Sequence, residues 1–346
     1  MINTVAMQKP KHTYAATYQK RETLTKSSSG GIFPAVANHI LSEGGVVFAT
    51  SLDEEFWPSV ISIDRPEELV RVQGSKYVQS NMGDSFHQIL GFLKSGRSVL
   101  FCGTPCQNAA VRKYMKGYDD NLYLIDIVCH GVSSVQLFQD YIHHLEHQKN
   151  IQINRFTFRD KKFGQDNYFS YTYEKHGKQA YSCHRAAKSS YYKLFLMNAL
   201  FRESCYHCKF ASESRVGDLS ICDYWGVERE HPDFVSQVRS ENLCGISGIL
   251  VNTSKGEALL QQISPELIIT PSTFAQISRH NPQLLKSSAK SSDREHIFKL
   301  YHTGGYAAVD HYYFKKYRGN ILKGDIGSIL PLSLRKKING WMRGQN

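Results

Sequence analysis

The 346-residue sequence predicts a mixed α/β fold: a parallel βαβ core sheet, an antiparallel strand region and a cysteine-rich loop. Two apolar runs with strand character, Ser98–Cys102 and Leu122–Val128, are each followed by a helical stretch. This alternation is typical of a parallel βαβ unit. Beyond residue 150, Ile151–Phe158 and Tyr168–Tyr173 alternate in the manner of antiparallel strands. The chain's only C-x-x-C follows them and marks the loop.

The first hundred residues are expected to alternate strands and helices. The pattern predicts an edge strand at Thr13–Tyr18, a helix from about Ile32 to Glu43 after a Ser/Gly turn, and a strand starting at Val46. A helix at Asp84–Lys94 precedes the βαβ unit. Small residues ahead of a helix leave backbone N–H groups free for an anion, although a plain capped start is the commoner interpretation of such spacing.

Two cysteines follow the strands of the βαβ unit. Pro105 suits the first turn of a helix, which places Cys106 at a helix N-terminus, where the partial positive charge favours a thiolate. Cys129 ends the second strand, and Ser133 or Ser134 can cap the helix after it. Both cysteines should therefore leave the carboxyl edge of the sheet, where open α/β folds bind ligands. This edge is the candidate active site.

The remaining chain is expected to hold an aromatic helix at Tyr191–Phe201 and a buried strand at Ser247–Asn252, with a helix beginning at Ser254. We divide the chain into a basic N-terminal segment (1–26), an α/β half (27–150), a mixed α/β half with the C-x-x-C (151–260) and a helical, basic C-terminal region (261–346).

Composition limits the classes of protein to which the chain can belong. Its apolar content of 41% is that of a globular protein. No apolar run is long enough to span a membrane, and the first residues are no signal peptide, so a cytoplasmic location is expected. In a reducing compartment, the eight cysteines are better interpreted as metal ligands, redox groups or core residues than as disulfides.

The net charge of +11 is concentrated at the two ends of the chain. Residues 1–26 hold five Lys/Arg and one acid, and residues 311–346 hold eight Lys/Arg and one acid, so the part between them is neutral. Basic ends suit docking to an acidic protein or peripheral contact with an anionic membrane surface, and no nucleic acid is expected. The alternative, to which we give equal weight, is that the basic ends are simply solvated tails. The basic, amphipathic stretch Arg335–Arg343 is too short to indicate a membrane helix.

The cysteine spacing leaves the bound metal open. Cys205 and Cys208 alone could form half of a zinc site, a redox pair or half of an iron–sulfur site. A four-cysteine cage needs two further thiolates, which the sheet edge offers in Cys106 and Cys129. Zinc would make the site structural, whereas a [4Fe–4S] cluster would make it an electron relay. We expect buried neutral thiols at the other four positions, Cys102, Cys183, Cys222 and Cys244.

Six motifs occur in an order that resembles one family. They are Ser28-Ser-Gly-Gly-Ile-Phe, Gly74-Ser-Lys-Tyr-Val-Gln-Ser, Gly103-Thr-Pro-Cys-Gln, Cys129-His-Gly-Val, Ser204-Cys-Tyr-His-Cys-Lys-Phe and Asp223-Tyr-Trp-Gly. From about Tyr14 to about Gly256 the chain resembles the coenzyme F420 hydrogenase/dehydrogenase beta-subunit family. The first two motifs are most similar to bacterial members encoded beside polysaccharide-synthesis genes.

The resemblance implies cofactors and a set of residues to bind them. Members of the family bind FAD and a [4Fe–4S] cluster and pass electrons between ferredoxin-type carriers and a small organic acceptor. By resemblance, Cys106, Cys129, Cys205 and Cys208 would hold the cluster, and residues 27–150 would be the flavin-binding half. The residues implied to line the flavin are Ser29, Gly30, Gly31, Ser75, Lys76, Tyr77, Gln79, Gly103 and Thr104.

Two side chains are implied to be catalytic. Lys76 could stabilise negative charge on the flavin. His130 borders the cluster position and could relay a proton, or it could be a structural histidine that bonds a loop carbonyl. The deazaflavin coenzyme F420 is a further possible cofactor that the sequence does not indicate by itself.

The chain departs from the family pattern in two places. Relatives commonly begin with a ferredoxin-like region, which this sequence lacks. Either a separate ferredoxin or ferredoxin-domain protein donates the electrons, or the chain is a truncated remnant of such a relative. Cys222 stands where relatives usually have glycine, either as a core thiol or as an extra sulfur near the cluster.

The expected function is that of an iron–sulfur flavoprotein oxidoreductase, with a possible role in polysaccharide biosynthesis. One alternative is a non-enzymatic, zinc- or cluster-stapled partner subunit in a glycan-synthesis complex. Another is a transferase that uses Cys106 as nucleophile together with His130.

Overall fold

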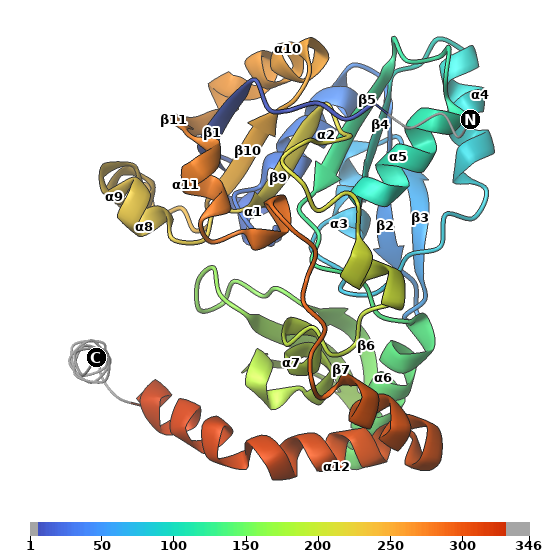
Figure 1. Ribbon diagram of the computed structural model, residues 1–346, viewed down its shortest axis with the longest axis vertical. Coiled ribbons are helices and arrows are strands. Elements are labelled where there is room, and N and C mark those ends of the chain that lie inside the picture. The colour runs from blue at the N-terminus through green and yellow to red at the C-terminus, as the bar shows by residue number, and fades with distance from the viewer. Residues whose placement is uncertain (1–5, 330–346) are drawn as a thin grey trace.

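The computed structural model describes residues 6–329, which form two β-sheets with helices around them (Figure 1). Within this range, the large sheet has eight strands in the order β11-β1-β10-β9-β5-β4-β2-β3, and the small sheet has three in the order β6-β7-β8. The predicted mixed α/β class is confirmed. The basic stretch Arg335–Arg343 lies outside the described residues.

Parallel strands form the centre of the large sheet. Strands β2, β4, β5 and β9 run parallel to one another, whereas β3, β10, β1 and β11 add antiparallel pairs at the two sides. The strands of this sheet are β1 (His12–Tyr18), β2 (Val46–Leu52), β3 (Pro58–Ile63), β4 (Val99–Gly103), β5 (Leu122–Ile127), β9 (Leu219–Asp223), β10 (Ser247–Val251) and β11 (Leu267–Ser272).

The helices largely follow the predicted positions. They are α1 (Arg21–Thr25), α2 (Ile32–Ser42), α3 (Leu69–Val72), α4 (Ser85–Lys94), α5 (Pro105–Tyr114), α6 (Val135–Lys149), α7 (Ser190–Leu196), α8 (Val227–Glu230), α9 (Pro232–Ser240), α10 (Ser254–Ile263), α11 (Phe274–Ser278) and α12 (Arg294–Ile329). Helix α7 ends earlier than expected, because Asn198 adopts a left-handed conformation (φ 57°) soon after it.

The βαβ unit forms because its helix starts are encoded locally. Thr104 caps α5 in a reciprocal capping box with Gln107, and Pro105 occupies the first turn. Ser134 caps α6 by accepting a hydrogen bond from the N–H of Leu137 at 3.3 Å. The predicted parallel pairing of β4 with β5 is confirmed.

Two expectations for the ends of the sheet were wrong. Strand β1 is not an edge strand, because β10 and β11 pair with it on either side. The region 261–346, expected to be helical, contains strand β11, which completes the sheet next to β1. Short alternating runs such as Leu267–Ser272 carry too little periodicity to be separated from loops.

The small sheet consists of β6 (Gln152–Thr157), β7 (Tyr168–Lys175) and β8 (Lys178–Arg185), all antiparallel, as expected for β6 and β7. It lies below the large sheet in Figure 1, together with α6, α7 and the long helix α12. An aromatic core joins these elements. Its fully buried members include Phe138, Phe158, Tyr191, Tyr192 and Phe201. The aromatic stripe of α7 is therefore core, as its spacing suggested.

No helix in the described range, residues 6–329, has the length and apolar character needed to cross a bilayer.

Candidate redox site at the carboxyl edge of the large sheet

Three parallel strands deliver the candidate site residues to one edge of the sheet. The pairs Gly103↔Asp126 and Ile127↔Ile221 set the registers of β4, β5 and β9. The chain then continues into Cys106 from β4, into Cys129 and His130 from β5, and into the Asp-Tyr-Trp-Gly motif from β9. The structure thus brings together motifs that lie more than 100 residues apart.

The four cysteines predicted as ligands interact electrostatically. Burial raises the pKa of the Cys129 thiol far above its ordinary value, and Cys106, Cys205 and Cys208 each raise it further. Cys106 is exposed and lies 3.1 Å from the Thr104 hydroxyl (Sγ to Oγ1), while the other three are partly buried. Four thiols from three segments of the chain therefore lie within electrostatic range of one another.

The C-x-x-C loop is attached to the segment after β5. Gly131 has φ 150° and faces the ring of Phe201 so closely that an added Cβ would lie 2.5 Å from it. The N–H of Arg202 donates to the carbonyl of Val132 at 2.8 Å, and the N–H of Cys205 donates to the carbonyl of Arg202 at 2.9 Å. These contacts fix Cys205 relative to Cys129.

A buried ion pair holds the far side of the same loop. The Asp126 carboxylate on β5 accepts from Arg215 Nη2 at 2.6 Å, and the two side chains are 0% and 1% exposed. The backbone N–H groups of Val216 and Gly217 donate to the second carboxylate oxygen at 3.1 and 2.8 Å. Arg215 also donates to the carbonyl of Phe210 at 3.1 Å, two residues beyond Cys208. Asp126 therefore connects the strand before Cys129 to the segment after Cys208.

Among residues 6–329, no group of three or more His, Cys, Asp or Glu side chains is arranged to hold a metal ion.

The two motifs implied to bind the flavin meet through their serines. The N–H of Ser75 donates to Ser28 Oγ at 2.8 Å, and the hydroxyl of Ser75 donates to the same oxygen at 2.9 Å. Gly30 packs against β10, where its N–H donates to Ser247 Oγ at 2.9 Å, so this N–H already has a partner within the protein. Gly31, with φ 76°, is the N-cap of α2, and no side chain caps the helix there. Because Pro34 has no N–H and the N–H of Ala35 bonds the carbonyl of Gly31, the N–H groups left at the start of α2 are those of Ile32 and Phe33.

Ser29 is held by the protein on several sides. Its hydroxyl donates to the carbonyl of Ile246 at 3.0 Å and accepts from Gln165 Nε2 at 3.1 Å. Its own carbonyl accepts from the Lys161 ammonium. The loop is therefore positioned by residues outside the motif.

Lys76 directs its ammonium at backbone carbonyls. It donates to Gln73 at 2.8 Å and to Val72 at 3.0 Å. Burial lowers the pKa of Lys76 to about 7, and Arg155 on β6 lowers it further, while Cys102 opposes the shift. A desolvated ammonium is suited to pair with an anionic group.

The neighbouring predicted residues serve mainly as supports. The ring of Tyr77 stacks on Phe195 at 4.8 Å and on Tyr192 at 5.5 Å between centroids, so it lies within the aromatic core. The side-chain carbonyl of Gln79 accepts from Arg202, next to the cysteine loop.

Gly103 and Thr104 link this loop to the start of α5. The N–H of Thr104 donates to Gln107 Oε1 at 3.0 Å, and Gln107 Nε2 donates to Ser80 Oγ at 2.8 Å. An added Cβ at Gly103 would lie 2.9 Å from Gln107 Oε1. The predicted flavin residues and Cys106 are therefore mechanically connected.

His130 lies close to a buried ion pair. Arg159 and Asp223 form a salt bridge of 2.7 Å, with side chains 3% and 16% exposed. Although His130 is exposed, desolvation by the surrounding protein lowers its pKa; Asp223 acts to raise that pKa and Arg159 to lower it. The carbonyl of His130 accepts from Ser288 Oγ at 2.7 Å, which fixes the backbone of this residue.

Sequence reasoning missed three side chains from the loop between β6 and β7. Arg159 donates to Tyr77 OH at 3.2 Å, Lys161 donates to the carbonyl of Cys244 at 2.8 Å, and Gln165 donates to Asp223 Oδ1 at 2.7 Å. The guanidinium of Arg159 also lies 5.2 Å from the centroid of the Trp225 ring. The sequence shows this loop only as a polar connection, and nothing in a single chain reveals its long-range partners.

The other cysteines near the sheet edge are distinct from the four. Burial raises the pKa values of Cys102 and Cys222 to about 12, and Cys222 contacts the carbonyl of Gly248 at 3.8 Å. The charged neighbours of Cys222 are Asp223 and Arg215. It is best described as a core thiol between β9 and β10.

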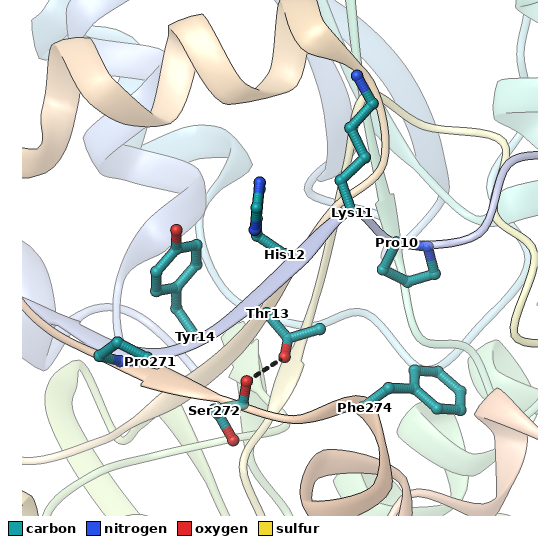
Figure 2. A pocket seen from close by; sticks show the side chains of 8 residues that line it. All are labelled: Pro10, Lys11, His12, Thr13, Tyr14, Pro271, Ser272 and Phe274. Carbon is teal, nitrogen blue, oxygen red and sulfur yellow. Dashed lines mark hydrogen bonds between the residues drawn. The ribbon is translucent and has the colours of Figure 1, made fainter.

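A separate cavity of about 430 Å³ lies between the start of β1 and the end of β11 (Figure 2). Thr13 Oγ1 donates across it to the carbonyl of Ser272 at 2.6 Å. Its lining contains none of the predicted site residues; it is formed by Pro10, Lys11, His12, Thr13, Tyr14, Pro271, Ser272 and Phe274.

Comparison with known families identifies the chain's relatives. The family model for the C terminus of the coenzyme F420 hydrogenase/dehydrogenase beta subunit matches residues 96–275, which include all four cysteines. The model for the N-terminal part of the same subunit matches residues 13–86. The chain belongs to the coenzyme F420 hydrogenase/dehydrogenase beta-subunit family. It is thereby a member of a family of redox-enzyme subunits, as its motifs suggested.

A solved structure from this group shares the fold. A chain of the F420-reducing [NiFe] hydrogenase complex from Methanosarcina barkeri superimposes with a TM-score of 0.52 at 14% sequence identity. The alignment covers 86% of this chain and 94% of that one. No curated protein matches the sequence.

Proposed function

We propose that this family member is an iron–sulfur flavoprotein oxidoreductase that transfers electrons from a separate ferredoxin-type protein to a small organic acceptor. The observation that carries the proposal is the convergence of Cys106, Cys129, Cys205 and Cys208, whose thiols act on one another electrostatically at the carboxyl edge of the sheet. A set of four thiols is the usual ligand set of a [4Fe–4S] cluster.

A set of four cysteines can hold either a [4Fe–4S] cluster or a zinc ion, and the two differ in how closely the sulfurs approach one another. Zinc binds thiolates at about 2.3 Å, which draws four sulfurs tightly together, whereas each cysteine of a four-iron cube binds a different iron and the sulfurs stay farther apart. The four thiols interact with one another electrostatically, and the metal content of the purified protein distinguishes the two arrangements. When bound, the cluster and a flavin would supply one-electron and hydride chemistry.

The residues of the flavin loop fit an anionic cofactor. The N-terminus of α2 has no side-chain cap, and the Lys76 ammonium is desolvated in the loop whose Ser75 bonds Ser28. In this proposal, Lys76 stabilises negative charge on the flavin, and Ser29, Gly31, Ser75 and Thr104 shape its binding loop. Coenzyme F420 itself is an acceptor to be tested rather than assumed.

His130 is proposed to handle protons at the acceptor. The desolvation that lowers its pKa favours the neutral imidazole at pH 7, which can accept a proton from a bound molecule. A role in polysaccharide biosynthesis would be set by the identity of that acceptor.

Anaerobic purification tests the proposal directly. We expect a brown protein with flavin absorbance and about four irons per chain. The Cys129→Ala variant should lose the iron and the visible absorbance, while Cys183→Ala on β8, outside the four, should keep both. Colourless protein with one zinc per chain would contradict the proposal and favour the stapled-scaffold alternative.

A further inference from the structure

A segment from late in the chain lies against the C-x-x-C loop. Ser287 Oγ donates to the carbonyl of Tyr206 at 2.8 Å, within that loop. The next residue, Ser288, donates its hydroxyl to the carbonyl of His130 at 2.7 Å, beside the second predicted cysteine ligand. These two bonds hold residues 285–294 next to both segments that carry the predicted cluster ligands.

The surface formed by residues 202–209 and 285–294, which we call the cysteine face, is positively charged. Its cations are Arg202, Lys209, Lys286, Lys290 and Arg294, and its carboxylates are Glu203 and Asp293. Glu203 is shared by two cations, Lys290 at 2.5 Å and Arg294 at 3.7 Å. Asp293 pairs with Lys316, which lies farther along α12 and outside the face. The carboxylates therefore leave most of the positive charge of the face uncompensated.

Three of these cations are exposed and have no carboxylate partner. Arg202 donates to the side-chain carbonyl of Gln79, and Lys209 Nζ lies 5.4 Å from the centroid of the Phe210 ring. Among the side chains that the structure describes, no acid lies within ion-pairing distance of Arg202, Lys209 or Lys286. Because all three are exposed, they can pair with the carboxylates of another protein.

The same face presents an apolar side chain and borders an accessible cysteine. Leu285, next to Lys286 in the chain, is 58% exposed. Cys106 is exposed as well, and it lies close enough to act electrostatically on the Cys205 thiol. An apolar contact point with charged side chains at its rim is typical of protein–protein interfaces. The cysteine face thus combines positive charge, an apolar contact point and access to the predicted cluster ligands.

We propose that the cysteine face docks a small acidic ferredoxin, with Lys209, Lys286 and Lys290 pairing with its carboxylates and Leu285 as the apolar contact. The inference rests on the proposed function for the identity of the partner, and it adds the place where that partner binds. Complementary charge speeds association and fixes the orientation of the two proteins. Docking occurs beside Cys106 rather than at the basic ends of the chain.

The composition of the face fits a short-lived complex. Redox partners meet through small interfaces, commonly below about 1,200 Å², whereas permanent interfaces are larger and more apolar. One exposed leucine among several exposed cations matches the first class. Since exposed charges are screened by salt, the complex should weaken as the ionic strength rises.

Binding of the full-length protein to a small acidic ferredoxin with two [4Fe–4S] clusters tests the proposal, measured by biolayer interferometry at about 50 and about 500 mM NaCl. The double variant Lys209→Glu/Lys286→Glu should raise the Kd at least about tenfold at the lower salt concentration, and the difference should shrink at the higher one. The matched control is Lys175→Glu/Lys178→Glu. Both of its lysines are exposed at the turn between β7 and β8, and the control changes the net charge by the same amount.

Cross-linking locates the contact independently of affinity. A carbodiimide joins lysine ammonium groups to carboxylates that they touch, and mass spectrometry identifies the linked residues. We expect ferredoxin carboxylates to be linked to Lys209, Lys286 or Lys290. Cross-links confined to residues 1–26 or 311–346 would overturn the proposal and assign docking to the basic ends.

The outcomes separate this inference from the proposed function, which iron and flavin content test. Equal Kd values for the two double variants, or no binding of ferredoxin to the unaltered protein, would overturn the docking site and leave the cofactor function standing. Colourless protein that still binds ferredoxin through the cysteine face would support the docking site and contradict the oxidoreductase function. Binding of phosphatidylserine vesicles instead of ferredoxin, lost in Lys209→Glu/Lys286→Glu, would assign the face to a membrane surface and overturn the proposal.

Discussion

The buried Asp126–Arg215 pair gives the sharpest test of how the cysteine loop is held. In the Asp126→Asn variant, the carboxylate becomes a neutral amide, and the Arg215 guanidinium, 1% exposed, stays buried without its counterion. The new NH₂ group would also face the N–H groups of Val216 and Gly217, which donate to Asp126 Oδ2 at 3.1 and 2.8 Å. Removing one partner of a buried pair costs about 3–5 kcal/mol.

The same loop provides a matched control. Lys9 and Glu213 form a salt bridge of 2.7 Å with side chains 71% and 38% exposed. Because solvent screens such a pair, Glu213→Gln should lower the unfolding free energy by less than about 1 kcal/mol. Each variant removes one carboxylate from an ion pair that ties the segment after Cys208 to another part of the chain, Asp126 to Arg215 and Glu213 to Lys9, and the two pairs differ in burial.

Urea unfolding monitored by circular dichroism measures the difference. We expect Asp126→Asn to lose several times more unfolding free energy than Glu213→Gln, at unchanged m-value. If the two variants unfold at the same urea midpoint, the buried Asp126–Arg215 pair does not hold the cysteine loop as argued. Under the proposed function, Asp126→Asn should also reduce the iron content of the purified protein, because Arg215 then no longer fixes the loop that carries Cys205 and Cys208.

Two further predictions concern the segment after β5. Gly131→Ala would place a methyl group 2.5 Å from the Phe201 ring. Overpacking of this kind lowers the free energy of unfolding by about 1–3 kcal/mol, which thermal unfolding would show. The control is Gly91→Ala on α4, where the new methyl group meets nothing within 4 Å, so this variant should be neutral or slightly stabilised. The pKa of His130 is lowered in the folded state, so unfolding free energy should fall as the pH drops below about 6.5, where the unfolded state binds more protons. His130→Gln should remove that part of the pH dependence, and an unchanged slope between pH 5 and 7 would show that the histidine is not desolvated.

The sequence predicted the centre of the fold well because its signals there are local. The Thr-Pro start of α5, the serine cap of α6 and the apolar runs of β4 and β5 each act within a few residues, and together they place Cys106 and Cys129 at one edge. Open α/β sheets bind ligands at the carboxyl ends of their parallel strands, so correctly predicted strands also predict where the site lies.

The periphery and the polar network were harder to predict because they depend on partners far along the chain. Nothing within Thr13–Tyr18 indicates that β10 and β11 pair with it on either side. The pairing of Arg159 with Asp223 joins residues 64 positions apart, and the residues between them do not encode it. Gly30 illustrates the same limit. The resemblance implied that it lines the flavin, whereas its N–H donates to the hydroxyl of Ser247, 217 residues away.

The place of β1 between β10 and β11 has a consequence for biogenesis. As the nascent polypeptide emerges from the ribosome, its first strand has no hydrogen-bonding neighbours until residues 247–272 have been synthesised. We therefore expect stalled or truncated chains to present an open strand that recruits chaperones or self-associates. Completion of the large sheet therefore has to wait until β11, residues 267–272, has been synthesised, long after β1.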